Sequence, residues 1–251
     1  MQDTSLERVN ILGTAIDSLT MEAAVERVGK LIESGWPHRV TVVNANKLWL
    51  MRRDKGLAEI VRSSDLIIPE YAVVWGAQRL GRPLRGHVAG IMLLQALLPV
   101  CEERGWRPYF LGARPEVILD TVRRVLLRHP RLNIAGWHHG YLNAESEPAV
   151  LADIRRSAPD LLFVAMGSPR QERWIHDHQA ELGVPVAMGV GGTFDVLAGR
   201  RREAPRWTRH GFEWLYRLAQ DPRLLRRYLV TNTWFVKEIY ASRLRTLRKA
   251  A

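Results

Sequence analysis

The sequence contains a single cysteine, Cys101, among its 251 residues. An internal disulfide is therefore impossible, and no set of cysteines and histidines has the spacing of a zinc site. The first eight residues lack the basic start and apolar stretch of a secretory signal. No apolar run approaches the roughly 18 residues that a membrane-spanning helix needs. These absences predict a cytoplasmic protein whose contact with a membrane is peripheral.

Common nucleotide and metal motifs are also missing. The run Gly189-Val190-Gly191-Gly192-Thr193 resembles a phosphate-binding loop, but it matches neither Gly-x-Gly-x-x-Gly nor a Walker loop that ends in Lys-Ser/Thr. No Asp-x-Asp pair of the kind that binds a metal-nucleotide complex occurs. The histidines at 138–139 and 176–178 lack a convincing set of further ligands. We therefore expect chemistry that uses no metal.

Positive charge is what the sequence has in excess. It carries 37 Lys and Arg against 26 Asp and Glu, a formal net charge of +11. Such a balance indicates a polyanionic partner, which could be nucleic acid, an anionic membrane surface or a phosphorylated substrate. Hydrophobic residues make up 47% of the chain, enough for a real core. The length suits one α/β domain with an appendage, or two small domains.

Short apolar runs rich in β-branched residues alternate with stretches of helical periodicity. Strands are expected at 40–43, 66–68, 108–111, 132–135, 161–165 and 184–188, and helices at 45–62, 73–80, 91–104, 115–128 and 149–157. Strands buried on both faces have continuous apolar sequences, as these do. The pattern predicts an α/β fold over residues 1–204, with a parallel sheet covered by helices on both faces.

The character of the chain changes after Gly199. Residues 205–251 contain eleven Lys and Arg against three acids, interleaved with aromatic residues, and show no strand pattern. Positions 225, 228 or 229, 232, 235 or 236, and 239 recur at helical spacing. This helical appendage suits a lipid headgroup region. Alternatively, its apolar side packs on the α/β domain and its arginines are only solvated.

Two glycine-containing loops each follow an expected strand. In the first, residues 167–172, Pro169 stands where a helix begins, so that Gln171 and Glu172 occupy its first turn and face the crevice at the strand ends. A first-turn Glu also satisfies the helix dipole without any ligand. In the second, residues 189–195, small residues let backbone N–H groups approach an anion. Asp195 either bonds a sugar hydroxyl or caps the helix.

Three further polar residues lie where strands end. Glu70 follows the run Leu66-Ile67-Ile68-Pro69, which places a carboxylate at the mouth of a strand as a candidate general base. Asn44 and His87 occupy similar positions, although a lone histidine is more often structural than catalytic. Asp65 or Glu172 could serve as a base on the same argument.

Eight short motifs together resemble the WecG/TagA/CpsF family of bacterial glycosyltransferases, over about 9–228. In order, they are Asn44-Ala45-Asn46, Pro69-Glu70, Val88-Ala89-Gly90, Phe110-Leu111-Gly112, His139-Gly140-Tyr141, Gly167-Ser168-Pro169-Arg170-Gln171-Glu172, Gly191-Gly192-Thr193-Phe194-Asp195 and Glu213-Trp214-Leu215-Tyr216-Arg217. The last three are the most specific, because they are improbable together by chance.

The resemblance implies a Rossmann-like core and an inverting transferase that acts on a UDP-sugar. The sugar would be an N-acetylhexosamine such as N-acetylmannosamine, or a related hexose or uronic acid. The acceptor would be a saccharide on undecaprenyl diphosphate at the inner face of the cell membrane, in the synthesis of a surface polysaccharide. No cofactor besides the UDP-sugar co-substrate is implied, and no nucleic acid. Self-association remains open.

The resemblance also assigns roles to residues. Glu70 is the implied catalytic base, and Arg217, Arg226 and Arg227 would neutralise the diphosphate in place of a metal. The implied donor site consists of Asn44, His87, Gly90, Gln171, Glu172, Gly191, Gly192, Thr193 and Asp195.

The chain departs from the family pattern near this pocket. Val42-Val43-Asn44 replaces Thr-Pro-Asn, and Pro69-Glu70-Tyr71 replaces Pro-Asp-Gly, so the base is one methylene longer. His87 stands in place of an Arg, and Met92 in place of an Asp. Two other hypotheses therefore stand beside the transferase: a non-catalytic subunit that binds a UDP-sugar, and a basic nucleic-acid-binding protein.

Overall fold

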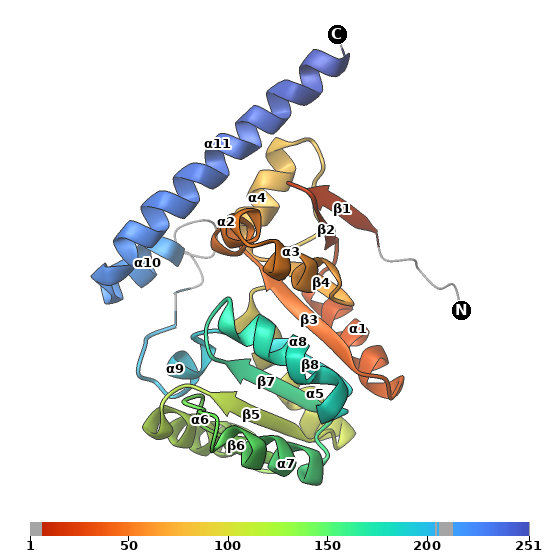
Figure 1. Cartoon of the computed structure of the whole chain (residues 1–251), viewed down its shortest axis with the longest axis vertical. Coiled ribbons are helices and arrows are strands. Elements are labelled where there is room, and N and C mark those ends of the chain that lie inside the picture. The colour runs from red at the N-terminus through yellow and green to blue at the C-terminus, as the bar shows by residue number, and fades with distance from the viewer. Residues whose placement is uncertain (1–6, 204, 206–212, 251) are drawn as a thin grey trace.

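A six-stranded parallel β-sheet forms the centre of the molecule (Figure 1). The computed structural model describes residues 7–203, 205 and 213–250. Across the sheet the strands are β4 (Leu66–Pro69), β3 (His38–Val43), β8 (Val186–Gly189), β7 (Leu161–Ala165), β5 (Pro108–Gly112) and β6 (Gly136–His138). Every neighbouring pair is parallel, which confirms the predicted α/β fold.

Side chains of each strand alternate between two apolar layers. On β7, Leu161 and Phe163 enter one core, whereas Leu162 and Val164 enter the other. One face is covered by α1 (Met21–Glu33), α5 (Gly90–Arg104), α6 (Pro115–Arg128) and α9 (Thr193–Leu197). The other is covered by α2 (Ala45–Arg53), α3 (Lys55–Arg62), α4 (Tyr71–Arg79), α7 (Glu147–Ser157) and α8 (Arg170–Leu182). This explains why the strands lack polar alternation.

Two predicted elements are wrong in detail. The helix expected at 45–62 is two helices, because Asp54 adopts an extended backbone and its Oδ1 accepts a hydrogen bond from Leu57 N at 3.0 Å, which starts α3. The strand expected at 132–135 instead begins at Gly136. A Cβ there would lie 2.5 Å from the Tyr109 ring, so only glycine lets β6 pair closely with β5.

A β-hairpin precedes the sheet, and the sequence pattern did not predict it. It consists of β1 (Arg8–Ile11) and β2 (Thr14–Asp17), joined by Leu12 and Gly13 with positive φ. Asp17 is fully buried at its end. Its Oδ1 accepts a hydrogen bond from Arg8 Nε at 2.8 Å, and its Oδ2 accepts one from Ile67 N at 2.7 Å. The carboxylate therefore attaches the hairpin to β4.

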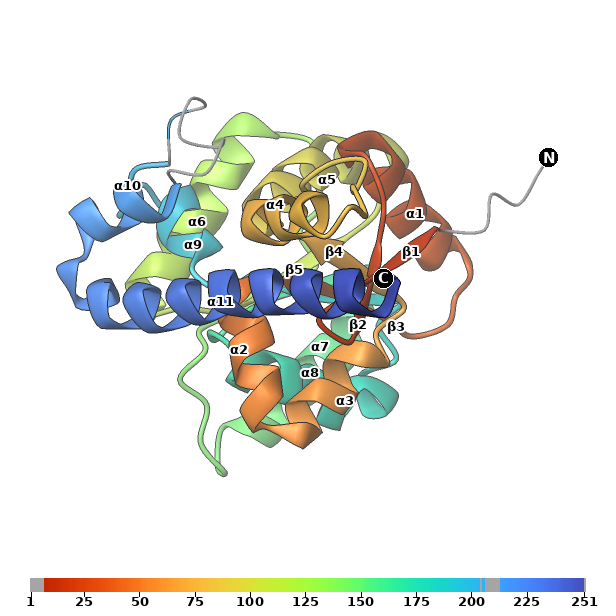
Figure 2. The same cartoon turned by 90° about the horizontal axis from the view of Figure 1, so that it is seen from above.

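The C-terminal segment is helical, as predicted, and consists of α10 (Glu213–Gln220), the 3₁₀ turn η2 (Pro222–Leu224) and α11 (Leu225–Ala250). Figure 2 shows α11 lying across the molecule with α2 on one side and α4 on the other. Phe235 and Ile239 are buried in this contact. A Cβ on Gly76 of α4 would lie 2.7 Å from Phe235 Cζ, so glycine permits the close approach. Within the described residues, no helix is both long and apolar enough to span a bilayer.

Candidate active site

Asn44 and Glu70 meet at the carboxyl ends of the neighbouring strands β3 and β4. The Asn44 side chain holds two groups: its Oδ1 accepts a hydrogen bond from Lys47 N at 2.9 Å, which starts α2, and its Nδ2 donates one to Glu70 Oε2 at 3.1 Å. Glu70 N donates to Val43 O at 2.9 Å, which continues the pairing of the strands. Both side chains are half-buried. The candidate base is therefore held in a defined orientation by a neighbouring amide.

His87 and Gly90 are brought to the same edge by the loop before α5. Val88 N donates to Pro69 O at 2.8 Å, so this loop runs beside the end of β4. The His87 ring meets the Tyr71 ring edge-on, with centroids 5.9 Å apart. Gly90 begins α5, where a Cβ would lie 3.3 Å from Val42 Cγ2. The structure thus gathers both residues near Glu70.

Gln171 connects the two glycine loops. Its Oε1 accepts hydrogen bonds from Gly167 N at 3.1 Å and from Gly191 N at 3.0 Å, so one amide oxygen holds the loops after β7 and β8 together. A Cβ on Gly189 would lie 2.4 Å from Gln171 Nε2, which explains why glycine ends β8. Gly167 and Gly191 both have positive φ. The glycines therefore serve the loop geometry as well as access to the backbone.

Glu172 and Lys47 form a buried ion pair beside Gln171. Glu172 Oε1 accepts hydrogen bonds from Lys47 Nζ at 2.6 Å and Gln171 Nε2 at 2.9 Å, and Oε2 accepts one from Ser168 Oγ at 2.7 Å. Burial alone would raise the pKa of Glu172, but the charge of Lys47 and the three hydrogen bonds outweigh it and hold the pKa below its ordinary value. The carboxylate is therefore ionised and supports the Gln171 side chain.

Sequence reasoning missed Lys47. Its side chain is only 5% exposed, although lysine is almost never fully buried unless it is paired. The sequence feature that could have indicated Lys47 was its position three residues after Asn44, at the start of a helix that follows a strand. Its partner lies 125 positions later, a separation that no local pattern reports.

The second loop leads into α9. Thr193 is buried, and its Oγ1 donates to Val190 O at 2.6 Å. Gly192 is exposed, and a Cβ there would meet no atom within 4 Å. The Asp195 carbonyl accepts hydrogen bonds from Arg200 N and Arg201 N at 2.9 and 3.0 Å. Gly192 is thus the position in this loop most open to a ligand.

The three predicted diphosphate-binding arginines lie in the C-terminal helices. Arg217 belongs to α10, but its side chain lies outside the described part of the structure. Arg226 and Arg227 are exposed at the start of α11, where the Arg227 guanidinium stacks on the Tyr228 ring at 5.2 Å. Among the described residues, no hydrogen bond or ion pair joins Arg226 or Arg227 to the strand-edge site. The same part of the chain holds no group of three or more His, Cys, Asp or Glu arranged to bind a metal.

Comparison with known proteins gives a consistent result. Residues 9–249 match the family described as the glycosyl transferase WecG/TagA/CpsF family. Three relatives share the name N-acetylglucosaminyldiphosphoundecaprenol N-acetyl-beta-D-mannosaminyltransferase. The Bacillus spizizenii protein is 38% identical over 172 residues, which are 68% of this chain and 66% of the relative. The Bacillus subtilis protein is 30% identical over 87% of this chain and 82% of its own length, and the Staphylococcus aureus MW2 protein is 32% identical over 85% of each. This chain belongs to the WecG/TagA/CpsF family of glycosyl transferases.

Proposed function

We propose that this chain transfers a sugar from a UDP-sugar to a saccharide carried on a polyprenyl diphosphate, in the synthesis of a cell-surface polysaccharide. The transferred sugar is an N-acetylhexosamine, with N-acetylmannosamine as the first candidate. The names of the three relatives support this sugar and this class of acceptor. The observation that carries the proposal is the hydrogen bond from Asn44 to Glu70 at the carboxyl ends of adjacent strands, where ligands bind in open α/β sheets.

In this mechanism Glu70 is the general base. It takes the proton from the acceptor hydroxyl as that oxygen attacks the anomeric carbon of the donor. The bond between that carbon and the UDP oxygen breaks, UDP leaves with the bonding electrons, and the configuration at the carbon inverts. The amide of Asn44 fixes Glu70 Oε2, so the carboxylate is oriented before the acceptor arrives.

The glycine loops hold the nucleotide of the donor. Gly192 offers open space in a loop that Gln171 ties to its neighbour. Gln171, Glu172 and Lys47 form the support of this site, whereas the backbone of the loops meets the ligand. Arg217, Arg226 and Arg227 stabilise the charge of the departing diphosphate without a metal, in the mechanism that we propose.

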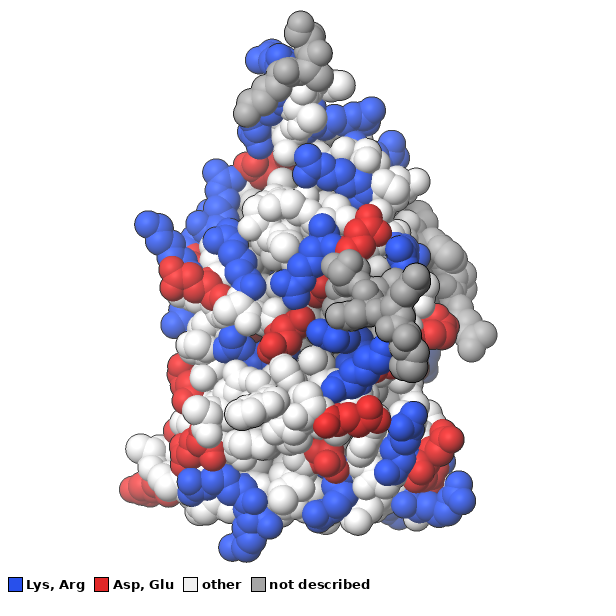
Figure 3. Space-filling model, turned by 90° about the vertical axis from the view of Figure 1, so that its right-hand side faces the viewer, with Lys and Arg blue, Asp and Glu red and all other residues white. Residues whose placement is uncertain are grey.

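The C-terminal helix docks the enzyme on the membrane. On the side next to its packed residues, α11 presents an exposed apolar stripe, which consists of Leu225, Leu229, Val236, Tyr240, Leu244 and Leu247. Basic side chains gather near the end of this helix, at the top of the face shown in Figure 3, where acidic ones are sparse. Apolar residues flanked by arginines suit the headgroup region of an anionic bilayer. This arrangement supports peripheral attachment at the inner face of the membrane, where a lipid-linked acceptor resides.

The reaction itself can be tested with defined substrates. The chain is incubated with UDP-N-acetylmannosamine and an N-acetylglucosaminyl polyprenyl diphosphate, with and without EDTA. We expect one released UDP for each N-acetylhexosamine added to the lipid, at the same rate in both samples. UDP binding without any transfer from a panel of UDP-sugars would instead indicate a non-catalytic subunit. Steeply salt-dependent binding of RNA or DNA without UDP affinity would indicate a nucleic-acid-binding protein.

A further inference from the structure

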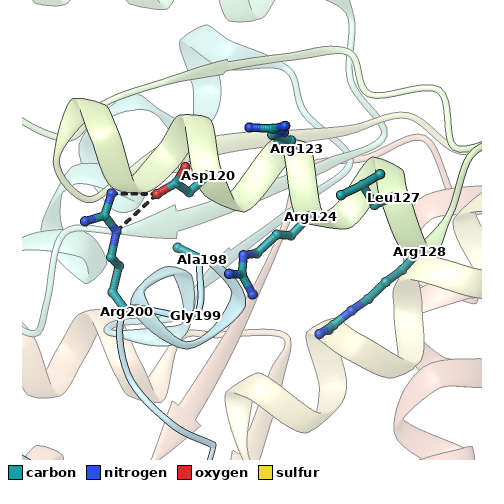
Figure 4. Close-up of a pocket in the computed structure, with 8 residues that line it drawn as sticks. All are labelled: Asp120, Arg123, Arg124, Leu127, Arg128, Ala198, Gly199 and Arg200. Atoms are coloured by element: carbon teal, nitrogen blue, oxygen red, sulfur yellow. Dashed lines mark hydrogen bonds and ion pairs between the residues drawn. The ribbon is translucent and has the colours of Figure 1, made fainter.

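A second basic site lies between α6 and the turn that follows α9, just beyond the second glycine loop. It is a cavity of about 580 Å³, within the range of roughly 300–1,000 Å³ found for small-molecule sites. Its lining residues are Asp120, Arg123, Arg124, Leu127, Arg128, Ala198, Gly199 and Arg200 (Figure 4). The lining thus holds four arginines against one aspartate, a formal charge of +3. None of these residues belongs to the predicted donor site.

The fold fixes one of these guanidinium groups and sets a second beside a glycine. Arg200 donates to Asp120 Oδ2 from both Nε and Nη2, at 3.1 and 2.6 Å. Arg124 lies against Gly199, since a Cβ on that glycine would be 2.5 Å from Arg124 Nη1. Gly199 also has a φ of +71°, so a larger residue there would be strained and would displace the Arg124 guanidinium.

The remaining charge in the cavity is uncompensated. Within the described part of the chain, Arg123, Arg124 and Arg128 form no ion pair. Arg124 and Arg128 stand one helical turn apart and extend from α6 on the side of the 198–199 turn (Figure 4). Like charges at this spacing repel each other, and a bound anion would remove the repulsion. Guanidinium groups match phosphate oxygens in geometry as well as in charge.

We propose that this cavity binds a phosphate-bearing anion, with Arg124 and Arg128 as its ligands (Figure 4). The turn that would hold the anion continues directly toward the C-terminal helices. Arg201 forms an ion pair with Asp221 at 2.9 Å, and Arg202 N donates to Gln220 Oε1 at 2.8 Å. An anion bound by Arg124 would therefore lie beside Gly199, in the segment that leads from the α/β core toward α10 and α11.

Calorimetric titration with inorganic diphosphate tests the site. We compare the wild type with Arg124→Gln/Arg128→Gln, and with Arg128→Gln alone in case loss of the Arg124 contact impairs folding. The control is Arg155→Gln/Arg156→Gln on α7, which removes the same charge from arginines already paired with Glu181 and Asp153. We expect saturable binding that weakens at least about tenfold in the double variant and remains unchanged in the control.

Binding to lipid vesicles shows whether the anion is a soluble phosphate compound or a lipid headgroup. If diphosphate does not saturate the site but binding to phosphatidylglycerol vesicles falls in the α6 variants and not in the control, the anion is a lipid phosphate, and the site stands. Diphosphate binding that UDP displaces and that the α6 variants leave intact belongs to the donor site and would overturn the proposal. Equal behaviour of the α6 variants and the control toward both probes would also overturn it.

Discussion

Lys47 Nζ lies 2.6 Å from Glu172 Oε1, in a pair whose side chains are 5% and 3% exposed. Lys47 stands in the first turn of α2 and Glu172 in the first turn of α8, so the pair joins the helices that follow β3 and β7. Glu172 in turn holds Gln171, which holds both glycine loops. One buried charge pair therefore supports the geometry of the nucleotide site that we propose.

Replacing Lys47 should lower the free energy of unfolding substantially. Lys47→Met leaves the Glu172 carboxylate buried without its cation, and such a loss destabilises a protein by about 3–5 kcal/mol. The free energy of unfolding can be measured by urea titration. Lys30→Met is the control, because the pair of Lys30 with Glu26 is 56% and 67% exposed, and such a pair is worth at most about 1 kcal/mol. Equal costs for the two variants would show that the buried pair does not support the fold.

The lowered pKa of Glu172 makes stability depend on pH. Its folded pKa lies below the ordinary value of 4.5, so its contribution is fully present above about pH 4.5 and is lost as the pH falls through the folded pKa. Urea titrations of the wild type and Glu172→Gln, from neutral pH down to about pH 3, measure this. We expect the stability difference between the two proteins to shrink with acid. A stability difference that is constant with pH would contradict a lowered pKa of Glu172 in the folded state.

Replacing Gln171 should reduce the affinity for the nucleotide more than it reduces the stability of the fold. Gln171→Ala removes the acceptor shared by Gly167 N and Gly191 N, so the two loops are no longer held together. We expect UDP affinity to fall at least about tenfold, or about 1.4 kcal/mol, in calorimetric titration. Gln179→Ala, two turns later on α8, is the matched control and should bind UDP as the wild type does. Unchanged affinity in Gln171→Ala would remove the loops from the nucleotide site.

The membrane docking that we propose for α11 can be tested at its exposed apolar stripe. Leu229 and Leu244 are 57% and 58% exposed on the apolar stripe. Leu229→Asp/Leu244→Asp should lower binding to phosphatidylglycerol vesicles at least about tenfold, because two charged carboxylates resist entry into the interface. Leu119→Asp, an exposed leucine on α6, is the control in the same sedimentation assay. Equal binding by all three proteins would show that α11 is not the anchor.

Much of the fold follows from local sequence patterns. The strands are short apolar runs, and a run buried on both faces, such as Leu161–Ala165, is typical of a parallel sheet. Strand ends are where ligands bind in such folds, so Asn44, Glu70 and the glycine loops could be named as candidate site residues before their contacts were known. Pro169 correctly marked the start of α8.

Long-range packing could not be predicted in the same way. The break at Asp54 depends on one capping hydrogen bond inside an otherwise helical pattern. The packing of α11 on the core brings Phe235 against Gly76, a residue 159 positions earlier in the chain. The burial of Lys47 depends equally on a distant partner. The structure shows that α11 packs with one side, through Phe235 and Ile239, and exposes leucines on another.

The sugar-transfer rate of a Glu70→Gln variant tests most directly the claim that Glu70 is the general base. The variant keeps the size of the side chain and can still accept a hydrogen bond from Asn44, but it cannot accept the proton of the acceptor hydroxyl. With UDP-N-acetylmannosamine and the lipid-linked acceptor, we expect kcat to fall by about 10²–10⁴-fold while UDP binds as in the wild type. Transfer at the wild-type rate would contradict the assignment of Glu70 as the base.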